Sequence, residues 1–419
     1  MELKYGSTTF TIDLPPERLA GVITPSPFTT TPPPAEIIET ALDLCHDSVS
    51  SFRPGEKVVI VTSDITRYTG SEIYLPLLVD RLNRQGIADD DIEILIALGI
   101  HRKQSDHEHR KILGKLFGRL RVTDHECDDP DALTCIGTTT NGIEVSINRK
   151  AVEAAHLILT GAIGFHYFAG FSGGRKSVLP GIAGRKACMA SHFTVLNQGE
   201  GSGKNPLAVT GNLGGNPVHQ AMVEGCAMAK PAFILNTVLA ADKRVIAAFA
   251  GDWYEAHEAG CRFYHDKFSY PLRAKADLVV ASCGGFPKDI NLIQAHKSME
   301  YASQSIKDGG VMILLAECRD GFGNGTFFNW FRHKNLVEFE ATLRAGYEIN
   351  GQTAYSLLQK ALRFRIILVS QFPVGQVEEM GMIAATSLEE AMGLAVGMLP
   401  ADWRCYLMPE AGSVLPVSA

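Results

Sequence analysis

The stretch EKVVIVTSDITR, residues 56–67, decides the fold class of this 419-residue chain. It is a short β-branched apolar run that stops abruptly at polar residues, and similar runs occur at 91–103, 154–166, 277–289, 309–317 and 364–372. Continuous Val/Ile/Leu runs of this length are typical of strands buried within parallel sheets. Stretches with helical periodicity lie between them, at 72–86, 290–310, 334–345 and 387–396. This alternation predicts an α/β fold with mostly parallel sheets and covering helices.

The sequence also predicts how the chain is divided. Its length favours two or three domains. A boundary is expected near 265–276, where DKFSYPLRAKA separates a Gly-rich region from a fresh series of strands and helices. We therefore expect an N-terminal domain at 1–270, with 400–419 as a candidate for its completion, and a C-terminal α/β domain at 271–399.

Two segments have compositions that disfavour regular structure. Residues 197–217, NQGEGSGKNPLAVTGNLGGNP, are rich in Gly and Asn and predict an ordered surface or active-site loop. The first forty residues contain PP at 15–16 and PPP at 32–34. They are expected to run extended over the surface, with one strand near 2–12.

Composition excludes several classes of protein. The chain has 39 Lys+Arg and 46 Asp+Glu, a net charge of −7, which argues against binding nucleic acid by bulk phosphate neutralisation. It has no apolar run of the roughly 18 residues needed to span a bilayer, and the N-terminus has no apolar signal region. Its nine cysteines include no Cys-x-x-Cys pair, which fits a reducing compartment. The prediction is a cytoplasmic protein without nucleic-acid or membrane partners.

Charged side chains and histidines, which can bind a substrate or transfer a proton, follow four of the predicted strands. Asp64 and Arg67 follow the first, His101 the second, His166 the third, and Lys288 with Asp289 the fourth. In open parallel sheets, ligands bind outside the carboxyl ends of the strands. The pattern therefore predicts a convergent site, although either histidine alone could equally be a loop histidine satisfied by local hydrogen bonds.

The densest segment is GFHYFAGFSGGRKSVLPGIAGRKACMASH, residues 164–192. Its glycines 170, 173 and 174 allow close backbone approach and offer N–H groups suited to a phosphate. Lys176 could be a phosphate contact, a nucleophilic amine or a covalent tether. The segment matches neither a Walker loop nor G-x-G-x-x-G. A tight turn with a surface lysine is the alternative interpretation.

The stretch at 290–310 adds a possible anion contact. Gln294 and Lys297 are three residues apart and share one helix face. A cation at this place could hold a substrate carboxylate, whereas a solvated helix lysine is the alternative.

Together these motifs resemble the nickel-dependent lactate racemase family of 2-hydroxyacid racemases and epimerases, over roughly residues 55–300. The matching pieces are Asp-x-Thr-Arg (Asp64, Thr66, Arg67), Gly-x-His-Arg (Gly99, His101, Arg102), the glycine-rich motif with Lys176 that ends in His192, and Gln294-x-x-Lys297.

The resemblance implies a two-domain α/β isomerase with its active site at the interdomain cleft, the N-terminal domain tethering the cofactor. That cofactor is a nickel-pincer nucleotide (pyridinium-3,5-bisthiocarboxylic acid mononucleotide), covalently attached at the position of Lys176. Its nickel is ligated by the histidine matching His192. Dedicated biosynthesis proteins mature it. Further cofactor contacts are implied for Asp64, Thr66, Phe168, Gly173, Gly174 and Gln294.

For catalysis, the resemblance implies that His101 and His166 are the acid/base pair and that Arg67 and Lys297 hold the substrate carboxylate. The C2 hydrogen would leave as hydride while a base takes the hydroxyl proton, giving a 2-keto acid. Imidazole suits such a base because its unperturbed pKa is near neutrality.

The chain departs from the lactate enzymes at Tyr68-Thr69-Gly70, where proline-rich sequence is expected, and has His296 in a stretch expected to face the pocket. Lactate, malate, a longer or aromatic hydroxy acid and a sugar acid all remain open as substrates. Two other classes also remain open. One is a metal-free phosphate- or nucleotide-binding α/β enzyme that uses Lys176 as a phosphate contact, and the other is a non-enzymatic cofactor carrier.

Overall fold

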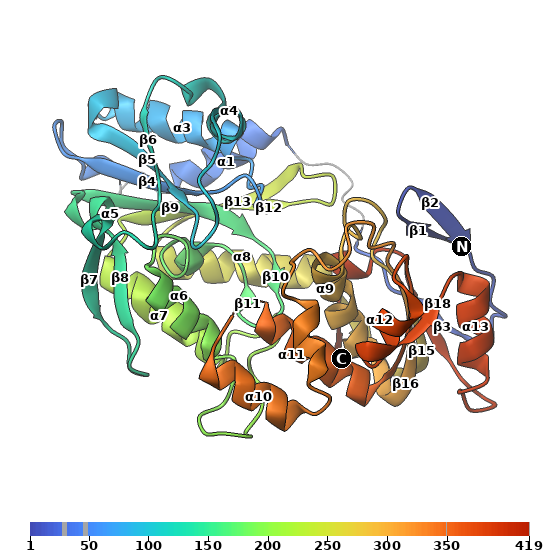
Figure 1. The fold of residues 1–419 in the computed structure, drawn as a ribbon. Coiled ribbons are helices and arrows are strands. Elements are labelled where there is room, and N and C mark those ends of the chain that lie inside the picture. Colours follow the sequence, from blue (N-terminus) through green and yellow to red (C-terminus); the bar gives the residue numbers. More distant parts are fainter. Residues whose placement is uncertain (27–31, 45–48, 349, 419) are drawn as a thin grey trace. The chain divides into compact units, whose positions relative to one another are not determined.

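The computed structural model describes residues 1–26, 32–44, 49–348 and 350–418 (Figure 1). The chain forms two compact units made of interleaved segments. Unit 1 comprises Met1–Pro27, Leu196–Lys204 and Lys267–Ala419, and unit 2 comprises Phe28–Val195 and Asn205–Asp266. The division after Asp266 falls within the expected boundary region. The first 27 residues, the short segment at 196–204 and residues 400–419 group with the C-terminal part instead of the N-terminal part.

Unit 2 is built on a six-stranded sheet in the order β13-β12-β9-β4-β5-β6. All pairs are parallel except β12 with β13. The strands are β4 (Val58–Ser63), β5 (Ile92–Ala97), β6 (Arg121–Asp124), β9 (His156–Ile163), β12 (Phe233–Leu239) and β13 (Val245–Gly251). The chain runs from β4 through β5 to β6 on one side and reaches β9 and β12 on the other. This reversal makes a topological switch point between β4 and β9, where open α/β sheets bind their ligands.

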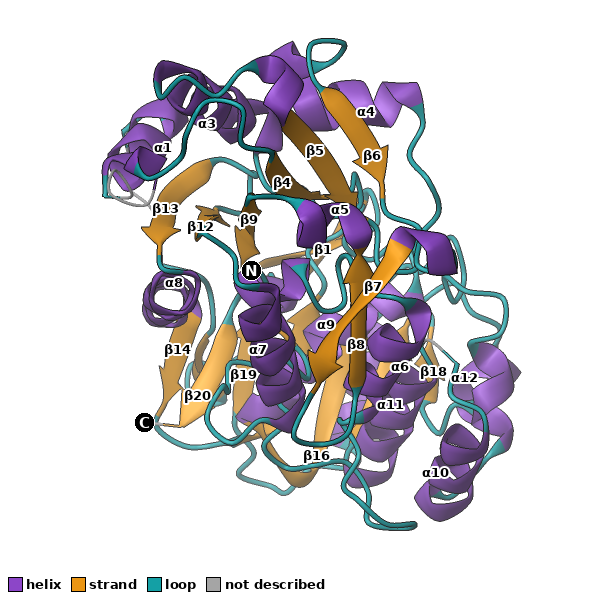
Figure 2. Cartoon of the chain, turned by 90° about the vertical axis from the view of Figure 1, so that its left-hand side faces the viewer, coloured by secondary structure: helices purple, strands orange, loops and turns teal. Residues whose placement is uncertain are grey.

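Helices cover this sheet because their apolar faces match its buried strands. Helices α1 (Pro34–Asp43), α3 (Ser71–Arg84) and α4 (Asp106–Leu113) lie on one face (Figure 1), where Ile38, Tyr74 and Leu113 enter a common core with β4 and β5. Further elements of unit 2 are α5 (Arg149–Glu153), α6 (Arg185–Phe193), α7 (Pro217–Ala229), α8 (Trp253–Phe268) and the short pair β10 (Phe165–His166) and β11 (Gly170–Phe171). Strands β7 (Leu133–Thr138) and β8 (Glu144–Asn148) form a separate antiparallel ribbon (Figure 2).

Unit 1 has a second six-stranded sheet, β18-β17-β16-β15-β19-β3, in which every pair is parallel. Its strands are β3 (Leu19–Val22), β15 (Ala276–Ser282), β16 (Ile306–Leu315), β17 (Arg365–Val369), β18 (Ile383–Ala385) and β19 (Cys405–Met408). The helices are α9 (Leu292–Ala302), α10 (Leu336–Ala345), α11 (Gly351–Arg363), α12 (Val374–Glu379) and α13 (Leu388–Val396). Strands β14 (Ser269–Leu272) and β20 (Leu415–Ser418) form a parallel pair.

The predicted α/β class with parallel sheets is confirmed, and each of the six apolar runs contains a strand. The N-terminus differs from the expected single strand. Gly6, at φ 52°, turns β1 (Glu2–Tyr5) back into β2 (Thr8–Thr11) as a hairpin. Helix α1 was not expected among the prolines, yet Pro34 occupies its first position, where a missing N–H costs nothing. In the described part of the chain, no helix has both the length and the apolar character of a membrane span.

Candidate active site

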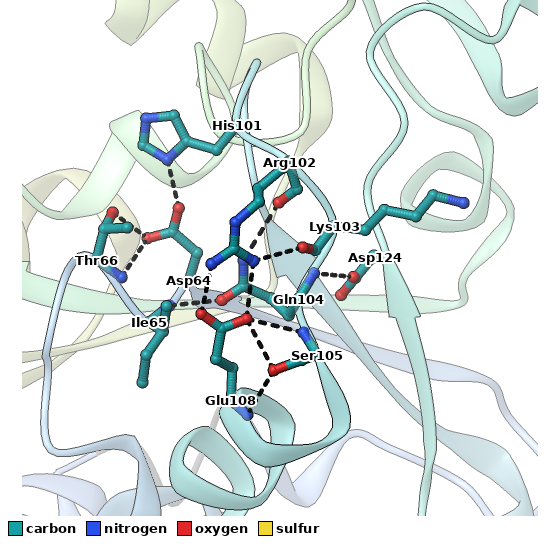
Figure 3. Close-up of polar contacts among 10 residues, drawn as sticks. All are labelled: Asp64, Ile65, Thr66, His101, Arg102, Lys103, Gln104, Ser105, Glu108 and Asp124. Carbon is teal, nitrogen blue, oxygen red and sulfur yellow. Dashed lines mark hydrogen bonds and ion pairs between the residues drawn. The ribbon is translucent and has the colours of Figure 1, made fainter. Parts of the chain in front are cut away.

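The loop after β4 carries a buried carboxylate that holds a histidine (Figure 3). Asp64 is only 3% exposed, and its Oδ2 lies 2.5 Å from His101 Nδ1. Its other oxygen, Oδ1, accepts hydrogen bonds from the backbone N–H of Thr66 at 3.1 Å and from Thr66 Oγ1 at 2.7 Å. The His101 side chain remains 39% exposed, so its ring is accessible beyond the carboxylate.

The pKa of Asp64 fixes how this pair is protonated. Burial raises that pKa, but hydrogen bonds from His101 and Thr66 and the positive charges of His101 and Arg67 lower it, and the net shift is downward. An ionised carboxylate can only accept, so Nδ1 of His101 donates to it. In the neutral ring, Nε2 then has a free lone pair, as a general base requires.

A second set of contacts fixes the loop after β5 against the loop after β4 (Figure 3). Gln104 Oε1 accepts from the N–H of Ile65 at 3.0 Å, and the N–H of Gln104 donates to Asp124 Oδ2 at 2.7 Å. Ser105 and Glu108 form a capping box at the start of α4. Our sequence reasoning missed these supports, although Ser-x-x-Glu before a helix is a recognisable capping signature.

His166 lies at the turn between β10 and β11. Its Nδ1 accepts the N–H of Ala169 at 3.3 Å, so a neutral ring carries its proton on Nε2. Burial, followed by the charges of Lys176 and His192, holds the pKa of His166 well below its ordinary value. Its ring meets the buried ring of Phe168 edge-on, with centroids 4.5 Å apart.

The glycine-rich turn after β11 requires glycine at two adjacent positions. Gly173 has φ 74° and Gly174 φ 57°, and a Cβ at Gly174 would lie 2.5 Å from His257. The N–H of Gly174 donates to Asn236 Oδ1 at 2.9 Å. That amide is therefore bonded within the protein, and its contact with a phosphate stays a prediction. Asn236 lies on β12, which sequence reasoning did not identify as a strand.

Lys176 follows on the same turn. Its Nζ lies 5.9 Å from the centre of the Phe168 ring and 3.8 Å from Met222 Sδ. Burial, then the charges of Arg175 and Arg67, hold its pKa well below the ordinary lysine value. A lysine in these surroundings favours the uncharged, nucleophilic amine.

His192 lies near the end of α6. Its Nδ1 is 2.7 Å from the carbonyl oxygen of Cys188, which can only accept, so Nδ1 carries the proton and the Nε2 lone pair stays free. Burial, followed by the charge of Lys176, lowers its pKa to about 3. A neutral imidazole with a carbonyl partner on Nδ1 is the usual form of a metal-ligating histidine. Its ring meets Phe168 edge-on at 5.3 Å.

Arg67 connects these groups electrostatically. Its charge contributes to the lowered pKa of Asp64, His166, Lys176 and His192. Residues from the loops after β4 and β9 and from α6 thus act on one another within unit 2. Lys288 and Asp289, which were predicted for the same site, lie in unit 1, where Lys288 Nζ is 3.0 Å from Glu410 Oε2 and Asp289 Oδ2 accepts from the N–H of Gly6 at 2.6 Å. Among the described residues, no group of three or more His, Cys, Asp or Glu side chains has the arrangement of a metal site.

The remaining predicted residues lie on α9 in unit 1. Lys297 Nζ donates to Gln294 Oε1 at 2.8 Å, and both side chains are exposed, which fits the expected shared face. His296 was expected to face the pocket, and this expectation is wrong. It is 1% exposed and lies on the buried side of α9, with Nε2 3.8 Å from Glu300 Oε2, which also pairs with Lys360.

The departure at Tyr68-Thr69-Gly70 is largely structural. Thr69 is buried with its hydroxyl 2.9 Å from Tyr74 Oη, and Gly70 caps α3 at φ 76°. Only Tyr68 is exposed, with its hydroxyl on Glu72 at 2.6 Å.

Comparisons with known proteins identify the family of this chain. The lactate racemase N-terminal domain profile matches residues 5–203, and the C-terminal domain profile matches residues 272–415. A lactate racemase from Thermoanaerobacterium thermosaccharolyticum is 34% identical over 99% of this chain and 98% of its own length. The chain belongs to the lactate racemase family.

A further relative and two solved structures are similar to this chain. A lactate racemase from Lactiplantibacillus plantarum is 38% identical over 78% of this chain and 77% of its own length. The solved apoprotein of the Thermoanaerobacterium lactate racemase is similar to the present structure with a TM-score of 0.89 and 33% identity, covering 99% of both chains. A protein from Thermotoga maritima shares the fold, with a TM-score of 0.65 at 19% identity over 93% of this chain.

Proposed function

We propose that the chain is a racemase or epimerase that inverts C2 of a 2-hydroxy acid, with a nickel-pincer nucleotide attached at Lys176. The observation that carries the proposal is the buried Lys176, whose charge acts on the rings of His166 and His192, in a chain of the lactate racemase family. Lactate is the first substrate to test, because two relatives bear that name.

The side chains fit the proposed cofactor. His192 offers a free Nε2 lone pair to nickel, and imidazole together with soft sulfur donors is reasonable nickel coordination. Lys176 favours the uncharged amine that a covalent bond requires. Phe168 forms an apolar wall between these two residues and His166. Asp64, Thr66, Gly173, Gly174 and Gln294 stay predicted cofactor contacts.

When bound, the nickel-pincer nucleotide would supply an acceptor for the C2 hydrogen and its electron pair. His101 Nε2 would take the hydroxyl proton as that hydrogen leaves, while Asp64 stabilises the imidazolium that forms. His166 would hold a proton on Nε2 for return to the 2-keto acid oxygen. We expect the two imidazoles to face the substrate from opposite sides, with Arg67 and Lys297 holding its carboxylate.

We also propose that the protein acts in the cytoplasm and is matured by the nickel-pincer nucleotide biosynthesis proteins. The metal-free alternative is less well supported. A phosphate salt bridge needs a charged ammonium, whereas burial and two neighbouring arginines disfavour that form of Lys176.

Intact mass tests the attachment. Protein co-expressed with the biosynthesis proteins should carry an adduct that peptide mapping locates on Lys176. Lys176→Ala should lose the adduct, whereas Lys186→Ala, which changes an exposed lysine on α6, should keep it. An unmodified parent chain under these conditions contradicts the tether.

Solvent exchange tests the chemistry. Racemisation of an unlabelled 2-hydroxy acid in D₂O by the loaded protein should give product that retains protium at C2, and chiral chromatography with mass spectrometry measures both. A simple two-base racemase would exchange the C2 proton with solvent. Substantial deuterium at C2 early in the reaction would therefore refute hydride transfer.

A further inference from the structure

The residue before Lys176 is an arginine buried beneath the glycine-rich turn. Arg175 is 1% exposed, and its guanidinium donates to the backbone carbonyls of the loop that precedes it. Those bonds run from Nη2 to Ala169 O at 3.0 Å, from Nη1 and Nη2 to Phe171 O at 3.2 Å each, and from Nη1 to Gly173 O at 3.4 Å. Three carbonyls therefore converge on one side chain, which fixes the backbone between Phe168 and Lys176.

Two histidines complete the surroundings of this guanidinium. Arg175 Nε donates to His219 Nδ1 on α7 at 3.0 Å, and Nη1 lies 2.9 Å from His257 Nε2 on α8. A guanidinium cannot accept, so Nδ1 of His219 must be unprotonated. Nε2 of His257 also lies 3.1 Å from the carbonyl oxygen of Ser172, which can only accept, so the contact with Arg175 does not by itself fix the tautomer of His257. Burial and the charge of Arg175 lower the pKa of His219 to about 3 and keep that of His257 well below its ordinary value. Both rings are therefore neutral at neutral pH.

The charge of Arg175 is not neutralised nearby. Among the described residues, no carboxylate forms an ion pair with it, and the groups that favour its charged form are Cys261, Cys226 and Tyr254. Burial lowers its pKa to about 10, so it stays charged at neutral pH. Placing a buried cation without a carboxylate is costly, and a neutral hydrogen-bonding side chain could hold the same carbonyls. Holding the carbonyls does not by itself explain why this side chain is charged, so we look for a function of the positive charge.

We propose that Arg175 is a positioning residue for Lys176, because its guanidinium holds three carbonyls of the glycine loop that presents this amine and places an unpaired positive charge at the adjoining position of the chain. His219 accepts from the guanidinium and His257 contacts it, and neither neutral ring cancels its charge. The inference rests on the proposed role of Lys176 as the attachment point. It concerns the chain before the cofactor is attached, when only an unprotonated amine can act as a nucleophile.

The other groups that face Lys176 come from three elements. Arg67 in the loop after β4 acts in the same direction as Arg175, and Cys188 on α6 acts in the opposite direction. His166 and His192 are coupled to Lys176 as neutral rings. Among these charges, that of Arg175 lowers the pKa of Lys176 the most, so Arg175 and its partners are the residues to vary.

The test uses the full-length chain without cofactor and measures how fast cyanate carbamoylates Lys176 between pH 6 and pH 10, by peptide mass spectrometry. Cyanate adds to an unprotonated amine without a leaving group, so the rate reports the uncharged fraction. The exposed Lys186 in the same sample is the internal reference. In the parent we expect half-maximal labelling of Lys176 well below the value of about 10.4 for an ordinary lysine.

Two matched variants separate charge from shape. His219→Asn and His219→Asp both place an oxygen near the position of Nδ1 and can accept from Arg175 Nε, but only the aspartate neutralises the guanidinium. We expect His219→Asp to raise the midpoint for Lys176 by at least one pH unit and to lower labelling at pH 7 about tenfold. His219→Asn should label like the parent.

Arg175→Gln provides the direct comparison and should raise the midpoint in the same direction. Equal midpoints in the His219→Asp and His219→Asn proteins would overturn the proposal, and this pair decides the question even where Arg175→Gln fails to fold. Because no cofactor is present, that result is distinguishable from failure of the proposed function, which would appear as a missing adduct in the co-expressed parent.

Discussion

Replacing Asp64 with asparagine should reverse the protonation of His101 while changing almost no volume. Thr66 donates two hydrogen bonds to Asp64 Oδ1, so in Asp64→Asn the amide oxygen should take that place. The NH₂ group then faces His101 Nδ1, which must accept from it. The proton of His101 moves to Nε2, and the atom proposed as the base loses its lone pair.

The structure gives the size of this effect. Two hydrogen bonds of about 1 kcal/mol each favour this amide orientation by about 2 kcal/mol, which is roughly a 30-fold bias toward the wrong tautomer. Losing the charged hydrogen bond to the imidazolium costs about 1.5–3 kcal/mol more, or roughly 10- to 100-fold. We therefore expect kcat of the loaded enzyme to fall about 300- to 3000-fold. The equivalent Asp-to-Asn change in serine proteases lowers kcat about 10⁴-fold.

Chiral chromatography measures kcat, and ¹⁵N NMR of the cofactor-free chain measures which nitrogen of His101 holds the proton. Thr66→Val supplies the control, because it removes one of the two orienting bonds. In the Thr66→Val background, Asp64→Asn should therefore lower kcat by a factor about five times smaller than the factor by which it lowers kcat of the parent. A kcat within threefold of the parent, or an unchanged tautomer in Asp64→Asn, would refute the reasoning.

Three further changes test other parts of the site. His192→Ala should abolish nickel retention in loaded protein by elemental analysis, whereas Cys188→Ala should keep it, because the variant retains the Cys188 carbonyl 2.7 Å from Nδ1 and loses only a thiol at 4.0 Å. Lys297→Met should raise KM for the hydroxy acid about 10- to 100-fold with the adduct retained; an unchanged KM would exclude the carboxylate contact. Glu300→Gln should destabilise the fold by about 3–5 kcal/mol at pH 7, because it leaves the buried cation of Lys360 uncompensated. Burial raises the pKa of Glu300, but Lys360 and other neighbours lower it to about 2, so its stabilising effect is present above about pH 4.5 and lost as the pH falls toward 2. The difference in Tm between parent and Glu300→Gln should shrink over that window, and a constant difference would count against the pairing.

The residues at strand ends could be predicted from the sequence because an apolar run stops abruptly where a buried strand ends. Asp64 and His101 stand directly after buried runs, and in the structure they form one hydrogen-bonded pair. Lys176 and His192 stood out by spacing, and the charge of Lys176 does act on the pKa of His192.

The supporting residues could not be read in the same way. Nothing in the sequence distinguishes a buried Arg175 satisfied by carbonyls from a surface arginine, and its partners His219 and His257 are 44 and 82 positions away. Asn236 and Thr237 interrupt the apolar run of β12, so the sequence did not show the continuous pattern of a buried strand there. The pairing of β3 with β19 could not be predicted either, because the four-residue β3, LAGV, has no pattern that identifies its partner.

The pairing of β3 with β19 has a consequence for how the protein is made. The side chain of Arg404 bonds to the carbonyl of Leu19 across 385 positions, and Cys405 donates to the carbonyl of Arg18. At a synthesis rate of about 5–20 residues per second, β3 leaves the ribosome roughly 20–80 s before its partner. Every segment of unit 2 has been translated once Asp266 is added, so this unit can fold while β3 still lacks its partner strand β19. If the ribosome stalls before Cys405, β19 is missing, so one edge of β15 and the strand β3 both lack a hydrogen-bonding partner. Chaperones and proteases are suited to recognise such exposed strand edges.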